Sequence, residues 1–183
     1  MPRTLRTIQD EMLVIRSQDG EPDALRELIA RWERRLHAHA WALTRDAEAA
    51  SDVTQEAWLA IARGIRRLSD PALFGSWAYR IVTHKCADWT RAQQRRRALE
   101  RGVAREAAVR SVAADGPDHA VTRLREALAA IDPERRAILS MRYLAEMSVN
   151  RIAAALDIPA GTVKSRLHHA REELKRALER KMS

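Results

Sequence analysis

Apolar residues recur through most of the chain at the three- and four-residue spacing of amphipathic α-helices. Residues 23–42 contain no glycine or proline, and their apolar positions fall on one helical face: Leu25, Leu28, Ile29, Trp32, Leu36 and Ala40. A second helix is predicted over about 46–63, before Gly64, which favours a helix end. A third is predicted over about 74–96, with an inner face of Phe74, Ala78, Ile81, Val82 and Trp89. The intervening residues 65–73 contain Ser-Asp-Pro and are predicted as a loop.

The C-terminal part of the chain carries the same periodicity in shorter segments. The pattern weakens over 98–120, where Ala-Ala-Asp-Gly-Pro-Asp indicates a linker. Asp132 and Ser148 are typical N-cap residues, and Pro133 suits a first helical position. These signals place the remaining helices at about 121–131, 133–144, 149–156 and 161–181. The last two are separated by a short break, which is the arrangement of a helix-turn-helix.

Composition favours an all-helical chain. Of the 183 residues, 46% are hydrophobic and 4% aromatic, with Gly 6 and Pro 6, a balance that suits helices and argues against β-sandwiches and low-complexity chains. We therefore expect an all-α fold of two small helical domains joined by a flexible linker, the C-terminal one a helix-turn-helix. The predicted boundaries are 1–97 for the first domain, 98–120 for the linker and 121–183 for the second domain.

Three features of the sequence indicate the cellular compartment of the protein. The single cysteine, Cys86, excludes a disulfide framework and a cysteine-based zinc site, and it fits a reducing cytosol. The longest apolar run, 57–62, is far shorter than the roughly 20 residues needed to span a bilayer. The N-terminal residues do not form the apolar segment of a secretory signal. We expect a cytoplasmic protein without membrane insertion.

The formal net charge of +8 is concentrated in two stretches. Residues 74–105 carry +6 and residues 160–183 carry +4, while 1–73 and 106–159 are each close to neutral. Two separate basic stretches favour two contacts with a polyanion such as nucleic acid. The alternative is a pair of solvated helix faces, which explains many charge runs.

The last predicted helix carries the clearest set of candidate binding residues. Val163, Leu167, Ala170 and Leu174 share a narrow stripe that must face a core. Around the rest of the helix lie side chains that suit phosphates and base edges in a DNA groove: Thr162, Lys164, Ser165, Arg166, His168, His169 and Arg171. The alternative is a helical hairpin with a basic solvent face.

A family resemblance begins in this segment. The run 158–172 (IPAGTVKSRLHHARE) resembles the −35-reading domain of extracytoplasmic-function (ECF) sigma factors of the bacterial sigma-70 family, and the preceding 132–143 and 148–153 fit the same domain. The family often has arginine where His169 stands. The resemblance implies that the exposed residues of the last helix contact duplex −35 DNA.

The resemblance continues upstream in residues 50–59 (ASDVTQEAWL), which are similar to the family's segment that docks on the clamp helices of RNA polymerase. It implies docking residues Asp52, Gln55 and Glu56. From the residues alone, Glu48, Asp52 and Glu56 form an acidic ridge that suits a basic protein partner and repels nucleic acid. An ordinary amphipathic helix with an acidic outer face is the alternative.

Residues 74–91, with the loop before them, resemble the family's −10-reading element, for which the implied DNA contacts are Arg66, Arg67, Ser69, Asp70, Trp77, Tyr79, Arg80, His84 and Arg91. Single-stranded bases need stacking surfaces and a basic track. Tyr79 is expected to lie away from the apolar stripe, Trp89 to pack in a core, and Trp77 could do either. His84 stands where the family usually has asparagine.

The sequence gives little support for a catalytic site or a metal-binding site. Glu33 and His37 could approach one metal ion but lack a third ligand, and His37 and His39 point to different sides of a helix. We expect no catalytic residue, no metal and no cofactor. The resemblance implies a sigma factor whose partners are core RNA polymerase, promoter DNA (duplex −35 and single-stranded −10) and an anti-sigma factor. The rival interpretations are a stand-alone helix-turn-helix transcriptional regulator and, more distantly, a basic helical protein on membrane surfaces.

Overall fold

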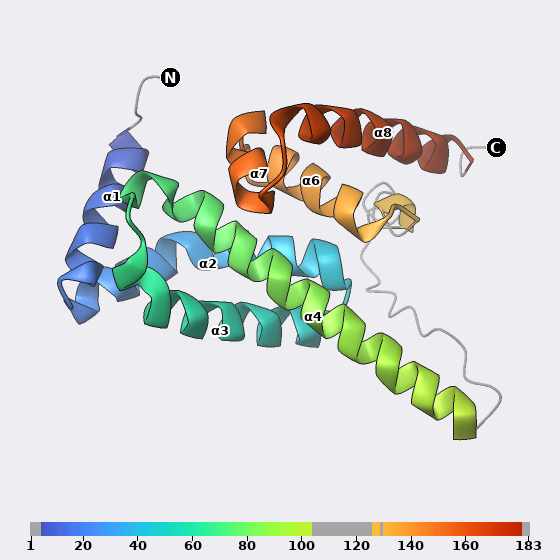
Figure 1. Cartoon of the computed structure of the whole chain (residues 1–183), viewed down its shortest axis with the longest axis horizontal. Helices are drawn as coiled ribbons and strands as arrows, with labels where there is room; N and C mark the ends of the chain where they lie inside the picture. The colour runs from blue at the N-terminus through green and yellow to red at the C-terminus, as the bar shows by residue number, and fades with distance from the viewer. Residues whose placement is uncertain (1–4, 104–125, 129, 181–183) are drawn as a thin grey trace, which may run out of the picture.

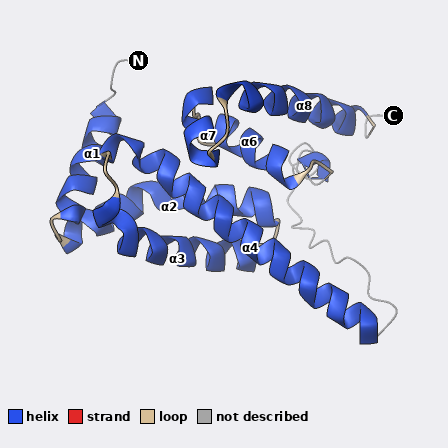
Figure 2. Ribbon diagram, in the orientation of Figure 1, coloured by secondary structure: helices blue, strands red, loops and turns tan. Residues whose placement is uncertain are grey.

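The computed structural model describes residues 5–103, 126–128 and 130–180, and the regular structure among them is entirely helical (Figure 2). The elements, with η for a 3-10 turn, are α1 (Leu5–Gln18), α2 (Pro22–Thr44), α3 (Ala47–Gly64), η1 (Ile65–Arg67), η2 (Pro71–Leu73), α4 (Phe74–Val103), α6 (Pro133–Tyr143), α7 (Val149–Leu156) and α8 (Ala160–Glu179). The predicted all-α class is confirmed. Helix α4 continues through Val103 and so includes the first residues of the linker predicted over 98–120. The rest of that linker and most of the helix predicted over 121–131 lie outside the described residues.

Local capping chemistry explains where several helices begin. The Asp46 carboxylate accepts a 2.9 Å hydrogen bond from Ala49 N at the start of α3. Asp132 does the same for Glu134 N (3.0 Å) at the start of α6. Ser148 Oγ accepts from the third residue of α7 at 3.3 Å. Each side chain satisfies a backbone N–H that has no partner within its helix, so the predicted caps at Asp132 and Ser148 are confirmed.

Helix α1 is not among the elements predicted from the sequence, although the residues of α1 pack closely on α2. Leu13 and Val14 are buried on that side, whereas Leu5, Met12 and Ile15 are exposed on the other. A helix with apolar residues on both faces has no single stripe, and four consecutive apolar residues from Met12 to Ile15 further obscure the helical period.

The N-terminal helices enclose a core between α2, α3 and α4 (Figure 1). Leu28 and Leu36 from α2, Ile61 from α3 and Val82 from α4 are fully buried there. Phe74, the first residue of α4, is 1% exposed and packs edge-on against the Trp32 ring at 5.4 Å. Because α4 continues to Val103, its C-terminal half extends past α2 and α3, where it is largely exposed.

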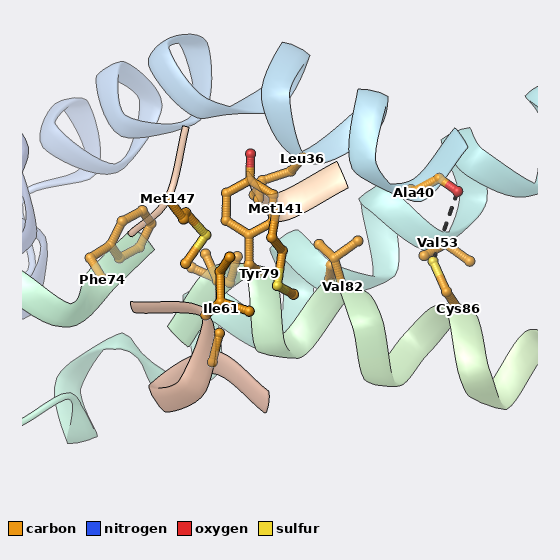
Figure 3. Close-up of a cluster of buried hydrophobic side chains, with 14 of the residues drawn as sticks. Leu36, Ala40, Val53, Ile61, Phe74, Tyr79, Val82, Cys86, Met141 and Met147 are labelled. Atoms are coloured by element: carbon orange, nitrogen blue, oxygen red, sulfur yellow. Dashed lines mark hydrogen bonds between the residues drawn. The ribbon is translucent and has the colours of Figure 1, made fainter. Parts of the chain in front are cut away.

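Helices α6, α7 and α8 form a second layer that packs on the first. Figure 1 shows them together beside α2 and α4, and the contacts run between α2 and α6 and between α4 and α7. Met141 of α6 is fully buried and Met147 nearly so, and both point into the cluster that contains Phe74 and Tyr79 (Figure 3). The two helical halves therefore share one apolar cluster.

A buried histidine, His39, lies where α2, α4 and α6 meet, a region that we call the joint. The Thr83 hydroxyl donates to Tyr79 O (2.8 Å), so its oxygen accepts from His39 Nε2–H at 2.9 Å. That assignment leaves His39 Nδ1 to accept from the Ser140 hydroxyl at 2.9 Å. One neutral imidazole of α2 thus contacts both α4 and α6, and complete burial lowers its pKa to about 3.

A buried arginine supports the same joint. Arg136 of α6 is 7% exposed, and its Nη1 donates to Leu43 O at 3.3 Å and to Ala42 O at 3.5 Å. Its Nη2 donates to Ile131 O at 2.9 Å. The carbonyl groups at the C-terminal end of α2 lack partners within the helix and carry the negative end of its dipole, so a guanidinium there is well placed.

We predict that His39 makes stability depend on pH. Because its pKa is about 3 in the packed protein and near 6.5 in the unfolded chain, acid protonates the unfolded chain first. Stability is therefore complete above about pH 6.5 and falls by about 1.4 kcal/mol per pH unit below it. Urea unfolding between about pH 7.5 and about pH 5 should show a loss of about 2 kcal/mol that His39→Gln, which cannot titrate, lacks. Equal losses in both proteins would contradict the prediction.

Candidate functional site

Helix α8 presents the polar face that the sequence predicted. Val163 and Ala170 are fully buried and Leu167 is 5% exposed, so the apolar stripe faces α6 and α7. The stripe fixes the orientation of the helix and leaves the remaining candidates outward: Lys164, Ser165, His168, His169 and Arg171 are exposed, and Thr162 and Arg166 are half-buried. The turn before α8 includes Asp157 in the left-handed conformation, with φ 55°, which lets α7 end sharply.

Two arginines of this face already have partners from α6. Arg166 forms a 2.9 Å ion pair with Glu134, in the first turn of α6. Arg171 Nε donates to the Tyr143 hydroxyl at 2.7 Å, and its guanidinium carbon lies 5.8 Å from the centre of that ring. Both contacts are at the surface, so they orient the guanidinium groups without contributing much stability.

A hollow on α4 brings together three residues predicted to contact −10 DNA. It measures about 320 Å³ and is lined by Trp77, Arg80, Ile81, His84, Lys85 and Asp88. Trp77 is half-buried, so part of it belongs to the core and part lines this surface. Arg80 reaches across to Asp157 of the helix-turn-helix, at 3.6 Å. An aromatic ring, a histidine and two cations in one hollow suit a stacked base with its phosphate.

The basic track continues beyond the hollow. Arg91 is exposed and forms a 2.5 Å ion pair with Asp88, and that hydrogen bond is the main reason why the pKa of Asp88 is lowered. Arg95, Arg96 and Arg97 follow on the exposed part of α4.

The prediction for Tyr79 is wrong. Its side chain is 2% exposed and lies inside the core, with its ring 4.9 Å from that of His39 and 6.4 Å from that of Trp32. Its neighbours come from α2 and from the second helical layer, which the periodicity of α4 alone could not show (Figure 3). Burial raises the pKa of Tyr79 to about 12. In this arrangement Tyr79 cannot stack on a base, and its ring packs in the cluster between the two helical layers instead.

The loop predicted at 65–73 consists of the two turns η1 and η2, and its four candidate residues Arg66, Arg67, Ser69 and Asp70 are all exposed. The Asp70 carboxylate accepts from Ala72 N at 2.9 Å, so this residue also caps η2. A residue that the sequence analysis did not single out, Gln18 of α1, donates hydrogen bonds to the loop backbone.

The acidic ridge of α3 also forms as expected. Glu48, Asp52, Gln55 and Glu56 are all exposed. Glu56 forms a 2.9 Å ion pair with Lys85 of α4, which places one end of the ridge beside the hollow. The opposite side of α3 is buried through Val53, Ala57 and Ile61, so the ridge faces away from the core.

Within the described residues there is no cluster of three or more His, Cys, Asp or Glu side chains that could hold a metal ion. Cys86 is 3% exposed, and burial raises its pKa to about 12, so it packs as a small buried hydrophobe. Among the same residues, no helix is both long and apolar enough to cross a membrane.

Family models match both halves of the chain. The model of sigma-70 region 2 matches residues 28–96, which contain the acidic ridge, the loop and the hollow. The model of sigma-70 region 4 matches residues 122–174, which contain the helix-turn-helix. The chain belongs to the ECF subfamily of the sigma-70 family. Sigma factors of this family direct promoter-specific transcription initiation by RNA polymerase.

This sigma factor is similar along most of its length to characterised relatives. It is 26% identical over 170 residues to the ECF sigma factor SigW of Bacillus subtilis, covering 87% of this chain and 91% of the relative. It is 27% identical over 184 residues to the sigma-H factor of Pseudomonas aeruginosa, covering 93% and 94%.

Solved structures share the fold of this sigma factor. CnrH, solved in complex with the cytosolic domain of CnrY, superposes with a TM-score of 0.72 at 23% identity, covering 93% of this chain and 97% of CnrH. RpoE of Bartonella quintana, solved with the anti-sigma factor NepR, gives 0.70 at 20% identity, covering 84% and 96%.

We predict that Tyr79→Phe leaves the free energy of unfolding unchanged or raises it by up to about 1 kcal/mol, because the buried hydroxyl has no hydrogen-bond partner among the described residues. Urea unfolding measures the effect. Tyr143→Phe, which removes an exposed hydroxyl bonded to Arg171, is the matched control and should change stability by less than about 0.5 kcal/mol. A clear loss in Tyr79→Phe would show that the hydroxyl is bonded.

Proposed function

We propose that this sigma factor docks on core RNA polymerase through the acidic ridge of α3, holds the single-stranded −10 element along α4 and the preceding loop, and grips duplex −35 DNA with α8. The observation that carries the proposal is the separation of these surfaces: one acidic and two basic faces lie on different helices of one chain. An acidic face repels nucleic acid and suits a basic protein surface, whereas the basic faces suit phosphates.

The domain assignment forms part of the proposal. Residues 1–97 act as the polymerase-docking and −10 module, 98–120 as the linker and 121–183 as the −35 module. The ranges matched by the two family models support these boundaries, because the gap between them falls on the proposed linker.

For the −35 contact, Lys164, Ser165, His168 and His169 point outward from the buried stripe of α8 and can reach base edges or phosphates in the major groove. The first turn of α8 supplies free backbone N–H groups near Thr162, which suit a phosphate. Arg166 and Arg171 exchange their contacts with Glu134 and Tyr143 for DNA phosphates.

For the −10 contact, the hollow on α4 receives a base against Trp77, with His84 on its edge, and Arg80 and Arg91 hold the backbone. Stacking on an aromatic ring contributes about 1–3 kcal/mol per base, which helps keep one strand out of the duplex. Because Arg80 pairs with Asp157, a phosphate bound there must displace that carboxylate. Arg66, Arg67 and Ser69 approach the same strand from the loop.

The chain supplies recognition, and we assign the chemistry of RNA synthesis to its partner polymerase, so the chain itself is not an enzyme. It acts in the bacterial cytoplasm, where that polymerase works. The two solved relatives were captured with the cytosolic domain of CnrY and with the anti-sigma factor NepR, and by that likeness we propose that an anti-sigma factor controls this chain.

A decisive experiment combines co-elution with core polymerase and run-off transcription on a randomised promoter library. We expect a stable complex and transcripts from defined start points that share −10 and −35 sequences. Tight, sequence-specific binding to duplex DNA without polymerase, together with no transcript, would instead support a stand-alone helix-turn-helix regulator.

We predict that Lys164→Glu weakens promoter binding and lowers its salt dependence, because a cation in contact with a duplex phosphate is lost. The slope of log K against log salt should fall by about 0.9 per lost contact. Binding of the holoenzyme to a labelled promoter over a salt series measures the slope. Lys175→Glu makes the same charge change on the same helix, outside the candidate face, and should leave the slope unchanged.

We predict that Asp52→Lys combined with Glu56→Lys weakens association with core polymerase at least tenfold, because two exposed charges of the docking ridge are reversed. Competition against wild-type protein for core polymerase measures the loss. The control is Glu27→Lys with Glu33→Lys, which reverses two exposed charges on α2. Normal association of the ridge variant would remove α3 from the docking surface.

A further inference from the structure

The backbone of the loop that precedes α4 accepts hydrogen bonds from a residue of α1, the first helix of the chain. Gln18, the last residue of α1, donates from Nε2 to Ile65 O at 2.9 Å and to Leu68 O at 2.7 Å. Ile65 O also accepts from Leu68 N at 3.1 Å, which closes the η1 turn. The carboxamide therefore uses both of its hydrogens to bridge the carbonyl of the first residue of η1 and that of Leu68, the residue that follows η1.

The loop has limited means of fixing its own shape. A 3-10 turn of three residues has poor hydrogen-bond geometry and little intrinsic stability. The Ile65 side chain, 2% exposed, anchors the loop at one end, and Phe74, 1% exposed, anchors it at the other. Between these anchors, Leu68 is half-buried against the core and Asp70 caps η2, while the side chains of Arg66, Arg67 and Ser69 are exposed. The bonds from Gln18 thus fix the backbone from which the candidate contacts project.

A second observation points to the same end of α1. Gly20, in the turn between α1 and α2, has a φ of +92°, which side-chain-bearing residues rarely adopt. A Cβ built there would lie 3.1 Å from Arg66 Nη2. The turn therefore passes directly beside the guanidinium group of a candidate DNA contact, and the absence of a side chain at position 20 leaves room for it.

We propose that Gln18 and Gly20 are positioning residues for −10 recognition: Gln18 fixes the backbone of η1, and Gly20 leaves the space in which Arg66 is held. The inference rests on the proposed function, in which the loop meets the −10 strand. Its physical basis is pre-organisation, since a loop that already has its bound shape loses less conformational entropy when a base binds. Neither residue touches DNA itself.

The test uses the full chain with core polymerase and three variants. Gln18→Met keeps the length and apolar stem of the side chain and removes both donors. Gly20→Ala places a methyl group against Arg66. Gln9→Met makes the identical change at an exposed position of α1 and serves as the control. Run-off transcription is measured on two promoter libraries, one randomised across the −10 region and one across the −35 region, beside amide hydrogen exchange of residues 65–70.

For Gln18→Met we expect faster exchange in the loop and discrimination among −10 sequences lower by about tenfold, the effect of losing two hydrogen bonds that each contribute a few-fold. Gly20→Ala should lower −10 discrimination by a smaller factor. Discrimination among −35 sequences and affinity for core polymerase should equal those of wild type. Gln9→Met should match wild type in every measurement.

Two results would overturn the inference: −10 discrimination unchanged in Gln18→Met, or equal losses at −10, at −35 and in polymerase affinity, which would mean general structural damage. The double variant Arg66→Ala with Ser69→Ala separates this inference from the proposed function. If that variant alters −10 preference while Gln18→Met does not, the positioning role is wrong and the loop still contacts DNA. If neither alters it, the loop does not contact the −10 element, and that part of the proposed function fails as well.

Discussion

The joint between α2, α4 and α6 places the candidate DNA surfaces of α4 and α8 relative to each other. The joint is apolar around Tyr79 and Met141, and it contains one neutral imidazole and one guanidinium whose polar atoms reach both helical halves. The burial of His39 is tolerated because it uses both ring nitrogens, and that of Arg136 because its Nη atoms cap the carbonyl end of α2 and bond Ile131 O. Such directional bonds hold the two halves in one register, which apolar packing alone specifies less strictly.

The joint explains how α4 can contribute to a core and to a candidate DNA surface at once. Neighbouring residues on a helix point about 100° apart, so Tyr79 and Arg80 project into different surroundings. Tyr79 enters the cluster shared with the second layer, while Arg80 lines the exposed hollow beside Trp77 and His84. Fixing the tyrosine in the core therefore fixes the direction of the arginine. On α8, the burial of Leu167 fixes the outward direction of its neighbour His168 in the same way.

The confirmed predictions depend on local chemistry, and most of the features that the sequence did not predict depend on long-range contacts. The caps at Asp132 and Ser148, the bounds of α3 and α7 and the outward face of α8 follow from residues within one or two turns of each other. The burial of Tyr79 depends on side chains from α2 and from the second layer, and the role of Gln18 depends on carbonyls 47 and 50 residues away. Helical periodicity carries no information about either. Helix α1 was missed because both of its faces are apolar.

Three arginines of the candidate DNA surfaces are held by carboxylates that are easy to displace. Arg166 pairs with Glu134, Arg80 with Asp157 and Arg91 with Asp88, all at exposed or half-exposed positions. An ion pair in such a position contributes only about 0–1 kcal/mol, because water screens the charges. Exchanging the carboxylate for a phosphate therefore costs little, whereas the released counterions of the nucleic acid favour the new contact. The pairs keep the guanidinium groups near the surface from which a phosphate can take them, so their weakness suits reversible binding.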